Sequence, residues 1–200
     1  MAGFQRRKQT KRKRGEGPRV GGPFATTNEV PIPEPMNRTL EASQMTDPRV
    51  MIVFGSPLSG VSEALQILHE VSRVGTNLVR GGDWLDAAQQ SLDGGNAVTL
   101  VDASALCTEH VQDAYDRRLV YPGSGALVRL WSSPEEALRR AQAKGRSDVT
   151  RDSLDDWGNN ILGLEARIRK LSLPYFMVPN EFGRLDNTIA ELARRAGITD

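Results

Sequence analysis

The chain has 200 residues, of which 38% are hydrophobic and 26% charged, as expected of an ordinary globular protein with one domain. Its longest apolar runs, residues 50–54 and 97–101, are far shorter than the ~20 residues that cross a bilayer, so we expect no transmembrane helix and no membrane partner. A single cysteine, Cys107, excludes an internal disulfide framework, and two histidines are too few for a structural zinc cage. We therefore predict a protein of the cytoplasm or of a virus particle, not a secreted one.

The charge is distributed unevenly along the chain. Residues 1–20 carry eight Lys or Arg and one Glu, whereas the other 180 residues carry 18 Lys or Arg and 24 Asp or Glu. Residues 1–48 are rich in Gly and Pro and lack any periodic apolar pattern, which predicts an extended or disordered tail.

The positive charges of this tail favour a polyanionic partner. Seven cations repel one another within nine residues, and binding to nucleic acid turns that repulsion into affinity through counterion release. The run contains no aromatic residue that could stack on bases, so we expect non-specific binding. The residues concerned are Arg6, Arg7, Lys8, Lys11, Arg12, Lys13 and Arg14. The proline-rich segment 30–35 would instead suit extended docking on another protein subunit.

From residue 49 to residue 200 the pattern predicts strands that alternate with helices. This alternation is typical of an α/β domain, here a five-stranded, mainly parallel sheet with helices on both faces. The expected strands are residues 50–54, 76–79, 97–101, 126–131 and 175–178. The first three expected helices are residues 61–74, 83–92 and 108–119.

Capping signals place the remaining helices. Ser133, Pro134 and Glu136 stand as N-cap, N1 and N3 of a capping box, and Gly145 is expected to close that helix. A longer helix is expected from Thr150 to Pro174, and a last one is expected to have Asp186 as its cap. The longer helix carries apolar residues at intervals of three and four, which favours a core-facing stripe over a partner-binding seam: Leu154, Trp157, Ile161, Leu164, Ile168 and Leu171. Cys107 is expected to be a small buried hydrophobic residue, and the three tryptophans, Trp84, Trp131 and Trp157, are expected to serve packing.

Residues 55–62, GSPLSGVS, have the frame of the phosphate loop G-x-x-x-x-G-K-[ST] between an expected strand and an expected helix. In such a loop the backbone N–H groups wrap phosphates, and the lysine reaches their terminal oxygens. Val61 stands at the lysine position, while Ser62 keeps the hydroxyl that would contact magnesium. An ordinary strand-to-helix turn is the alternative interpretation.

The opening RVMIVFGSPLSGVSEAL resembles that of polynucleotide-kinase-like and nucleoside-kinase-like P-loop proteins. Further on, DGGNAVTLVDAS is similar to the family's segment that ends in the Walker B aspartate, and LVRLWSSPEEALRRAQAKGR is similar to its arginine-bearing lid helix. The resemblance implies a nucleotide site at Gly55, Ser59, Gly60, Ser62, Arg140 and Arg146, with magnesium held through Ser62 and Asp102. It implies Asp83 and Asp102 as catalytic candidates, although the segment that carries the acceptor base, here Asp83 or Asp86, is much shortened.

The missing lysine decides between the hypotheses. Phosphoryl transfer depends on cations placed where negative charge develops. The loss of the lysine therefore predicts a catalytically degenerate kinase-like domain. We expect such a domain to act without a cofactor as a structural or interaction module, anchored by its basic tail among the subunits of a nucleoprotein assembly such as a phage particle. The alternative is an ATP- and Mg²⁺-dependent nucleoside or polynucleotide kinase in which Arg80 or a lid arginine replaces the lysine. A nucleotide-binding adaptor without turnover is a third hypothesis.

Overall fold

The structure is a computed structural model, and it describes residues 49–72, 75–94, 98–181 and 183–198. The predicted tail, residues 1–48, and its proposed nucleic-acid-binding cations lie outside the described residues. Within the described ranges, every helix is too short or too polar to cross a membrane.

Five parallel strands form a single sheet in the order β2-β3-β1-β4-β5. The strands are β1 (Val50–Gly55), β2 (Thr76–Arg80), β3 (Val98–Asp102), β4 (Gly125–Trp131) and β5 (Tyr175–Pro179). All six residues of β1 are buried, because this strand lies in the centre of the sheet with both faces covered. The predicted α/β fold class is confirmed, and the sheet is wholly parallel.

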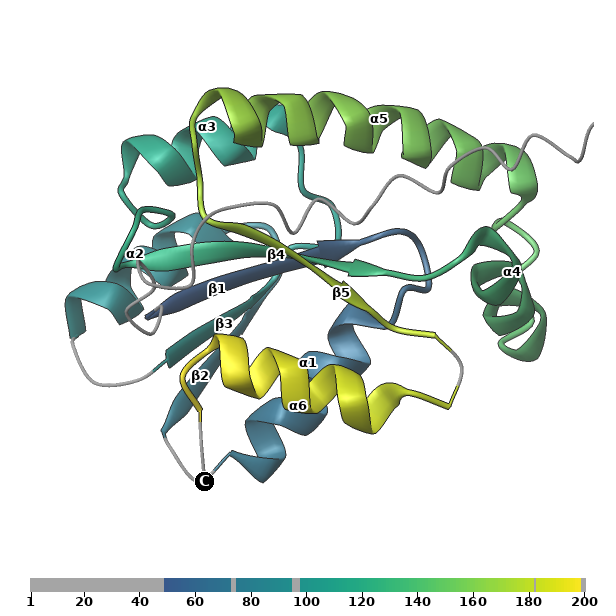
Figure 1. Cartoon of the computed structure of the whole chain (residues 1–200), viewed down its shortest axis with the longest axis horizontal. Coiled ribbons are helices and arrows are strands. Elements are labelled where there is room, and N and C mark those ends of the chain that lie inside the picture. Colours follow the sequence, from purple (N-terminus) through teal and green to yellow (C-terminus); the bar gives the residue numbers. More distant parts are fainter. Residues whose placement is uncertain (1–48, 73–74, 95–97, 182, 199–200) are drawn as a thin grey trace, which may run out of the picture. The chain divides into compact units, whose positions relative to one another are not determined.

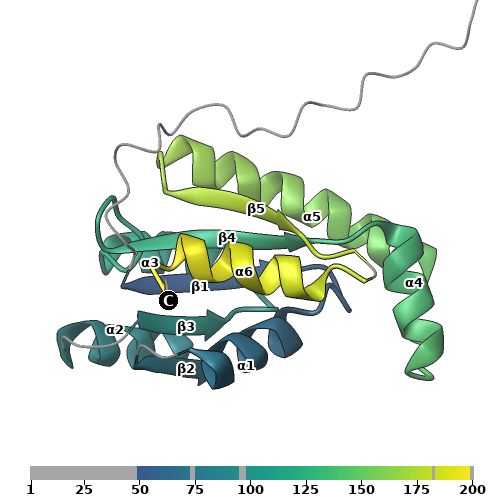
Figure 2. The ribbon, with the colours of Figure 1, turned by 60° about the horizontal axis from the view of Figure 1, so that its bottom comes forward.

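Helices cover both faces of the sheet (Figures 1 and 2). The helices α1 (Val61–Val71) and α6 (Leu185–Arg195) pack on one face, where Met51 and Val53 point toward them. The helices α2 (Trp84–Gly94), α3 (Thr108–Asp116) and α5 (Arg151–Lys170) pack on the other face, against Ile52 and Phe54. Alternate residues of β1 thus enter two separate cores. The helix α4 (Pro134–Ala143) lies beyond the carboxyl end of β4 (Figure 1).

Several helix ends differ from the predictions, among them the end of the first helix, which lies at Val71 and not at residue 74. The helix predicted for residues 108–119 ends at Asp116, because Arg118 has a left-handed backbone with φ 58°. The last helix has Arg184 as its N-cap, since the Arg184 carbonyl already accepts from the Thr188 N–H; Asp186 lies in the first turn, where a carboxylate still favours the helix dipole. The longer helix ends at Lys170, four residues before Pro174.

The packing predictions are confirmed only in part. The apolar stripe of α5 faces the core as predicted, and Trp84 is 5% exposed. Trp131, however, is 38% exposed because β4 ends there, beyond the cover of the helices.

Candidate functional site

The phosphate loop follows the central strand directly and leads into α1. A Cβ atom on Gly55 would come within 2.2 Å of the Ser59 Oγ atom and 2.6 Å of the Leu130 carbonyl oxygen, so only glycine fits. Gly60 has φ 87°, and a Cβ atom there would lie 2.5 Å from the Asn180 Nδ2 atom. Both glycines of the predicted motif are therefore required by the geometry of the turn.

Val61, at the lysine position of the motif, is the first residue of α1 and is only 4% exposed. Its side chain belongs to the core between the sheet and the helices α1 and α6. The valine is thus part of the hydrophobic core, and it also lines the cavity over the loop.

Ser62 and Asp102 are brought together as the motif predicted. The Ser62 hydroxyl donates to the Asp102 carboxylate at 2.5 Å, and the Ser104 hydroxyl donates to the other carboxylate oxygen at 2.6 Å. The contact arises because β1 and β3 are neighbours in register, with Val53 opposite Asp102. This pair could hold a magnesium ion carried by a nucleotide, although the described residues contain no cluster of three His, Cys, Asp or Glu suited to a metal.

Arg140 ties α4 to the phosphate loop. Its guanidinium donates to the Leu58 carbonyl at 3.2 Å, to the Asn180 carbonyl at 2.7 Å and to the Glu136 carboxylate at 2.6 Å. Asn180 in turn is 2% exposed and donates from its side-chain amide to the Ser59 carbonyl at 2.7 Å. Arg140 therefore contacts the loop through the Leu58 carbonyl, and it shares the buried Glu136 carboxylate with Arg139.

The other arginines of the predicted lid also pair with carboxylates. Arg146 makes two hydrogen bonds to Asp148 at 2.6 and 2.7 Å, which lower the pKa of that carboxyl to about 2. Arg139 bonds Glu136 at 2.8 Å, and this bond, with that of Arg140, holds the Glu136 pKa below its usual range. The structure therefore does not bring Arg146 to the loop cavity, in contrast to the implied nucleotide site.

The predicted capping box of α4 is only half formed. The Ser133 hydroxyl accepts from the Glu136 N–H at 3.3 Å, as expected of an N-cap. The Glu136 carboxylate is held by the two arginines instead of reaching back, and the Ser133 N–H donates to Glu181 at 2.8 Å. Gly145 closes the helix with φ 64°, as predicted.

A cavity of about 390 Å³ lies over the phosphate loop. It is lined by residues 55–63 together with Ser104, Ala105, Arg140, Lys144 and Trp157. The Ser59 Oγ atom is buried at its floor and has no hydrogen-bond partner among the described residues. Lys144, which the sequence analysis did not single out, is exposed, and its ammonium forms no hydrogen bond or ion pair with another described residue.

Comparison with solved structures identifies the fold. The *YorR* protein of Bacillus subtilis, in complex with phosphorylated GDP, has a TM-score of 0.52 at 12% identity, over 72% of this chain and 94% of that one. The chain has a P-loop kinase-like fold. A gluconokinase of Sinorhizobium meliloti has a TM-score of 0.47 at 19% identity, over 76% of this chain and 96% of that one. The shikimate kinase of Acinetobacter baumannii has a TM-score of 0.48 at 10% identity, over 76% of this chain and 94% of that one. No protein-family model and no curated protein matches the sequence.

In the kinase-like domain, neither acidic residue considered as an acceptor base lines the loop cavity. Asp83 is exposed just before α2, and its carbonyl accepts from the Ala87 N–H at 3.3 Å. Asp86 forms an ion pair with Arg117 at the surface. Arg80, considered as a substitute cation, instead donates to the Ser62 carbonyl at 3.0 Å.

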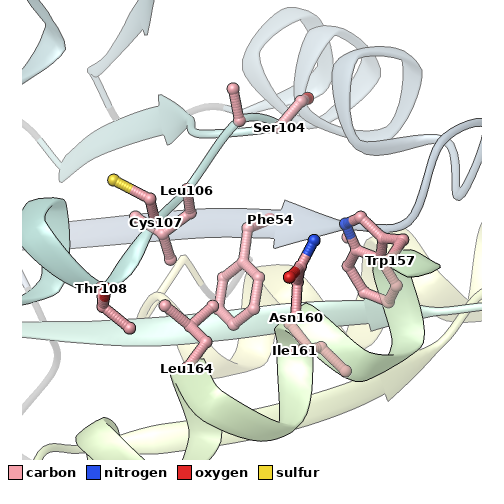
Figure 3. Close-up of a pocket in the computed structure, with 11 residues that line it drawn as sticks. Phe54, Ser104, Leu106, Cys107, Thr108, Trp157, Asn160, Ile161 and Leu164 are labelled. Atoms are coloured by element: carbon pink, nitrogen blue, oxygen red, sulfur yellow. The ribbon is translucent and has the colours of Figure 1, made fainter.

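A second cavity, of about 410 Å³, adjoins the loop cavity of the kinase-like domain (Figure 3). Trp157, Asn160, Ile161 and Leu164 of α5 line it from one side, and residues 104–108 after β3 line it from the other (Figure 3). Cys107 is partly exposed here, so the prediction of a buried packing residue was wrong. The apolar stripe of α5 predicts only a packing role for Trp157 and gives no signal for Asn160, because such a stripe does not show which residues of the helix face a cavity.

Proposed function

We propose that this kinase-like domain does not transfer phosphoryl groups and serves as a structural or interaction module. The replacement of the motif's lysine by Val61 carries the proposal, because this uncharged side chain offers no cation to phosphates in the loop cavity that it lines. Further support comes from Arg139 and Arg140, which share the Glu136 carboxylate, and from Arg146, which pairs with Asp148. In this proposal the basic residues 6–14 anchor the domain in a nucleoprotein assembly, for which a phage particle is one setting, among other protein subunits.

The test is ATP turnover by the full chain with magnesium. We expect a rate equal to the buffer background, because the negative charge that develops on the transferred group has no cation from α1. Turnover above background in the parent chain, abolished by Ser62→Ala, would contradict the proposal. The Ser56→Ala variant is a matched control, since Ser56 lies in the same loop but outside the Ser62–Asp102 pair.

A kinase with a substitute cation is the second candidate, and Lys144 favours it. This lysine lines the loop cavity as the C-cap of α4, a helix that Arg140 ties to the loop, and the Ser62 hydroxyl contacts Asp102 on the same side of the loop. The likeness to *YorR*, solved with phosphorylated GDP, is consistent with a nucleotide ligand and supports no more than the fold.

Thermal unfolding with millimolar ATP and magnesium distinguishes these candidates. A ligand that binds only the native state raises the melting temperature. A rise that Lys144→Ala removes, together with turnover, would establish the kinase; a rise without turnover would establish a nucleotide-binding adaptor. We expect no rise if the domain is a structural module without a nucleotide site. Gln142→Ala, an exposed position on the same helix outside the cavity lining, is the control for Lys144→Ala.

A further inference from the structure

The outer face of α5 carries an exposed stripe that no other described element covers (Figures 1 and 2). Its residues recur at intervals of three and four, the spacing that places side chains on one face of a helix and that packed helix pairs use. Leu162, near the centre of the stripe, is 60% exposed. The stripe consists of Asp152, Asp155, Asn159, Leu162, Ala166 and Arg169, all of them exposed.

A cavity of about 330 Å³ opens beside this stripe. Asp155 and Asn159 line it from α5, and Trp131 lines it from the end of β4. Met177 lies on the neighbouring strand β5, two residues before the register partner of Trp131. Trp131, Leu162 and Met177 are three of the five large hydrophobic side chains that the described residues expose. Apolar surface that the fold leaves uncovered therefore gathers around this cavity.

The exposed charges of α5 differ in sign between its two halves. The first half has one exposed cation, Arg151, which pairs with Glu135 at 2.8 Å, and three exposed carboxylates. The second half has two exposed cations, Arg169 and Lys170. A second α5 in antiparallel orientation would bring the acidic half of each helix to the basic half of the other, whereas a parallel one would bring like charges together. The three carboxylates are those of Asp152, Asp155 and Asp156.

The spacing of the stripe also gives the register of such a pair. With a two-fold axis between residues 160 and 161, Asp152 of each copy faces Arg169 of the other, and Asn159 faces Leu162. Leu162 of the second copy then lies at the rim of the cavity that Asn159 and Trp131 line. The same surface is used on both copies, as a closed two-fold dimer requires.

We propose that the exposed face of α5 binds a second copy of this chain in antiparallel orientation, with Asp152 and Arg169 paired at both ends. A pair of helices buries less than the standard interface of ~1,600 Å², so we expect a weak dimer whose population rises with concentration. The inference goes beyond the proposed function, because it names a partner for a surface outside the loop cavity and does not depend on whether the domain transfers phosphoryl groups.

Sedimentation equilibrium of the full chain, freed of nucleic acid, measures the dissociation constant of the dimer. Asp152→Lys and Arg169→Glu should each weaken the dimer by about tenfold, because each change places two like-charge pairs in the interface. The double variant should recover the parent's constant, since both pairs form again with their signs exchanged. Glu109→Lys is the matched control, because Glu109 is exposed and is the second residue of α3, as Asp152 is of α5.

Leu162→Gln tests the apolar centre of the face without changing its charge. It should weaken the dimer by about tenfold, because the contact near the two-fold axis is lost on both copies. Val71→Gln on α1, where the side chain is 62% exposed, should leave the dimer unchanged. All four substituted positions are exposed, and a thermal unfolding curve verifies that each variant folds.

Three results would overturn the proposal. One is a chain that stays monomeric at every attainable concentration, as it would if another part of the chain or a different protein covered this face. The second is a dimer that Leu162→Gln and both charge reversals leave unchanged. The third is a double variant that associates no more tightly than the two single variants. ATP turnover is measured separately, so none of these results bears on the proposed function.

Discussion

Val61 and Ser62 are neighbours in sequence with opposite surroundings. The valine points into the core beneath the loop, whereas the serine points toward Asp102 at the carboxyl end of β3. The pair that would meet a magnesium ion is thus kept, while the position from which lysine would reach a phosphate is part of the hydrophobic core. The phosphate loop thus has the serine of the motif, Ser62, and lacks its lysine, because Val61 stands at that position.

Glu136 offers a residue-scale test of how α4 supports the loop. It is 7% exposed and accepts from both Arg139 and Arg140, whereas its neighbour Glu135 is exposed and pairs with Arg151. Glu136→Gln should lower the free energy of unfolding by about 1–3 kcal/mol, because two arginines lose a charged acceptor. Urea unfolding at pH 7 measures the loss, with Glu135→Gln as the matched control, which should leave the free energy of unfolding nearly unchanged because its ion pair is exposed to solvent.

The effect of Glu136→Gln should also depend on pH in one direction. The folded-state pKa of Glu136 lies below its ordinary value, chiefly through the hydrogen bond from Arg139, so its contribution is complete above the unfolded pKa of about 4.3. The contribution is lost as the pH falls through the folded pKa. The difference between parent and variant should therefore shrink toward zero below about pH 4. A difference that stayed constant from pH 7 to pH 3 would show that the carboxylate charge is not what the arginines require.

At the scale of elements, periodicity and caps predicted every strand and helix of the described residues, including β2, of which only Val79 is buried. The parallel sheet followed from their alternation. Ends were less predictable, because they depend on bonds across the fold: Glu136 was expected to reach back to Ser133, but Arg139 and Arg140 hold it instead. Asp186 lost the cap position to Arg184 because the Arg184 carbonyl accepts the first helical bond.

The position of α5 over the sheet depends on a buried polar contact that the sequence does not predict. Glu165 accepts from Arg129 of β4 and from the Tyr175 hydroxyl of β5, both at 2.7 Å, and the Arg129 and Glu165 side chains are 14% and 12% exposed. Burial raises the pKa of Tyr175, and the Glu165 carboxylate raises it further, so the phenol stays protonated and donates. Arg129 also lies over the Trp157 ring at 5.3 Å.

Glu165→Gln should therefore destabilise the protein by about 3 kcal/mol, because it leaves the Arg129 charge buried without a counter-charge. Asp155→Asn, on the same helix with a 61% exposed side chain, should cost less than about 1 kcal/mol. Urea unfolding of both variants measures the difference. Equal losses would mean that the buried contact contributes no more to the docking of α5 than a surface ion pair does.

At the scale of the whole molecule, the candidate site is assembled from segments far apart in sequence. Phe54, residues 104–108 and Asn160 meet only because β1 and β3 are adjacent in the sheet and α5 packs on the face of the sheet that carries Phe54. The phosphate loop could be predicted because its residues are contiguous and its glycines are required locally. The second cavity and the place of Lys144 could not be predicted, since nothing in the local sequence indicates which exposed residues a later helix will bring to the loop.

Residues 1–20 are predicted to bind nucleic acid through their positive charges. Removing it takes away eight cations and one carboxylate, so salt-sensitive binding to nucleic acid should be lost while the kinase-like domain remains folded. Binding to a random-sequence DNA duplex, titrated at several salt concentrations, measures the loss, and thermal unfolding verifies the domain. A matched control keeps the full length and replaces Arg6, Arg7, Lys8, Lys11, Arg12, Lys13 and Arg14 with glutamine. If that chain still bound DNA with the parent's salt dependence, the affinity would have to come from the rest of the chain, where acidic residues outnumber basic ones by six.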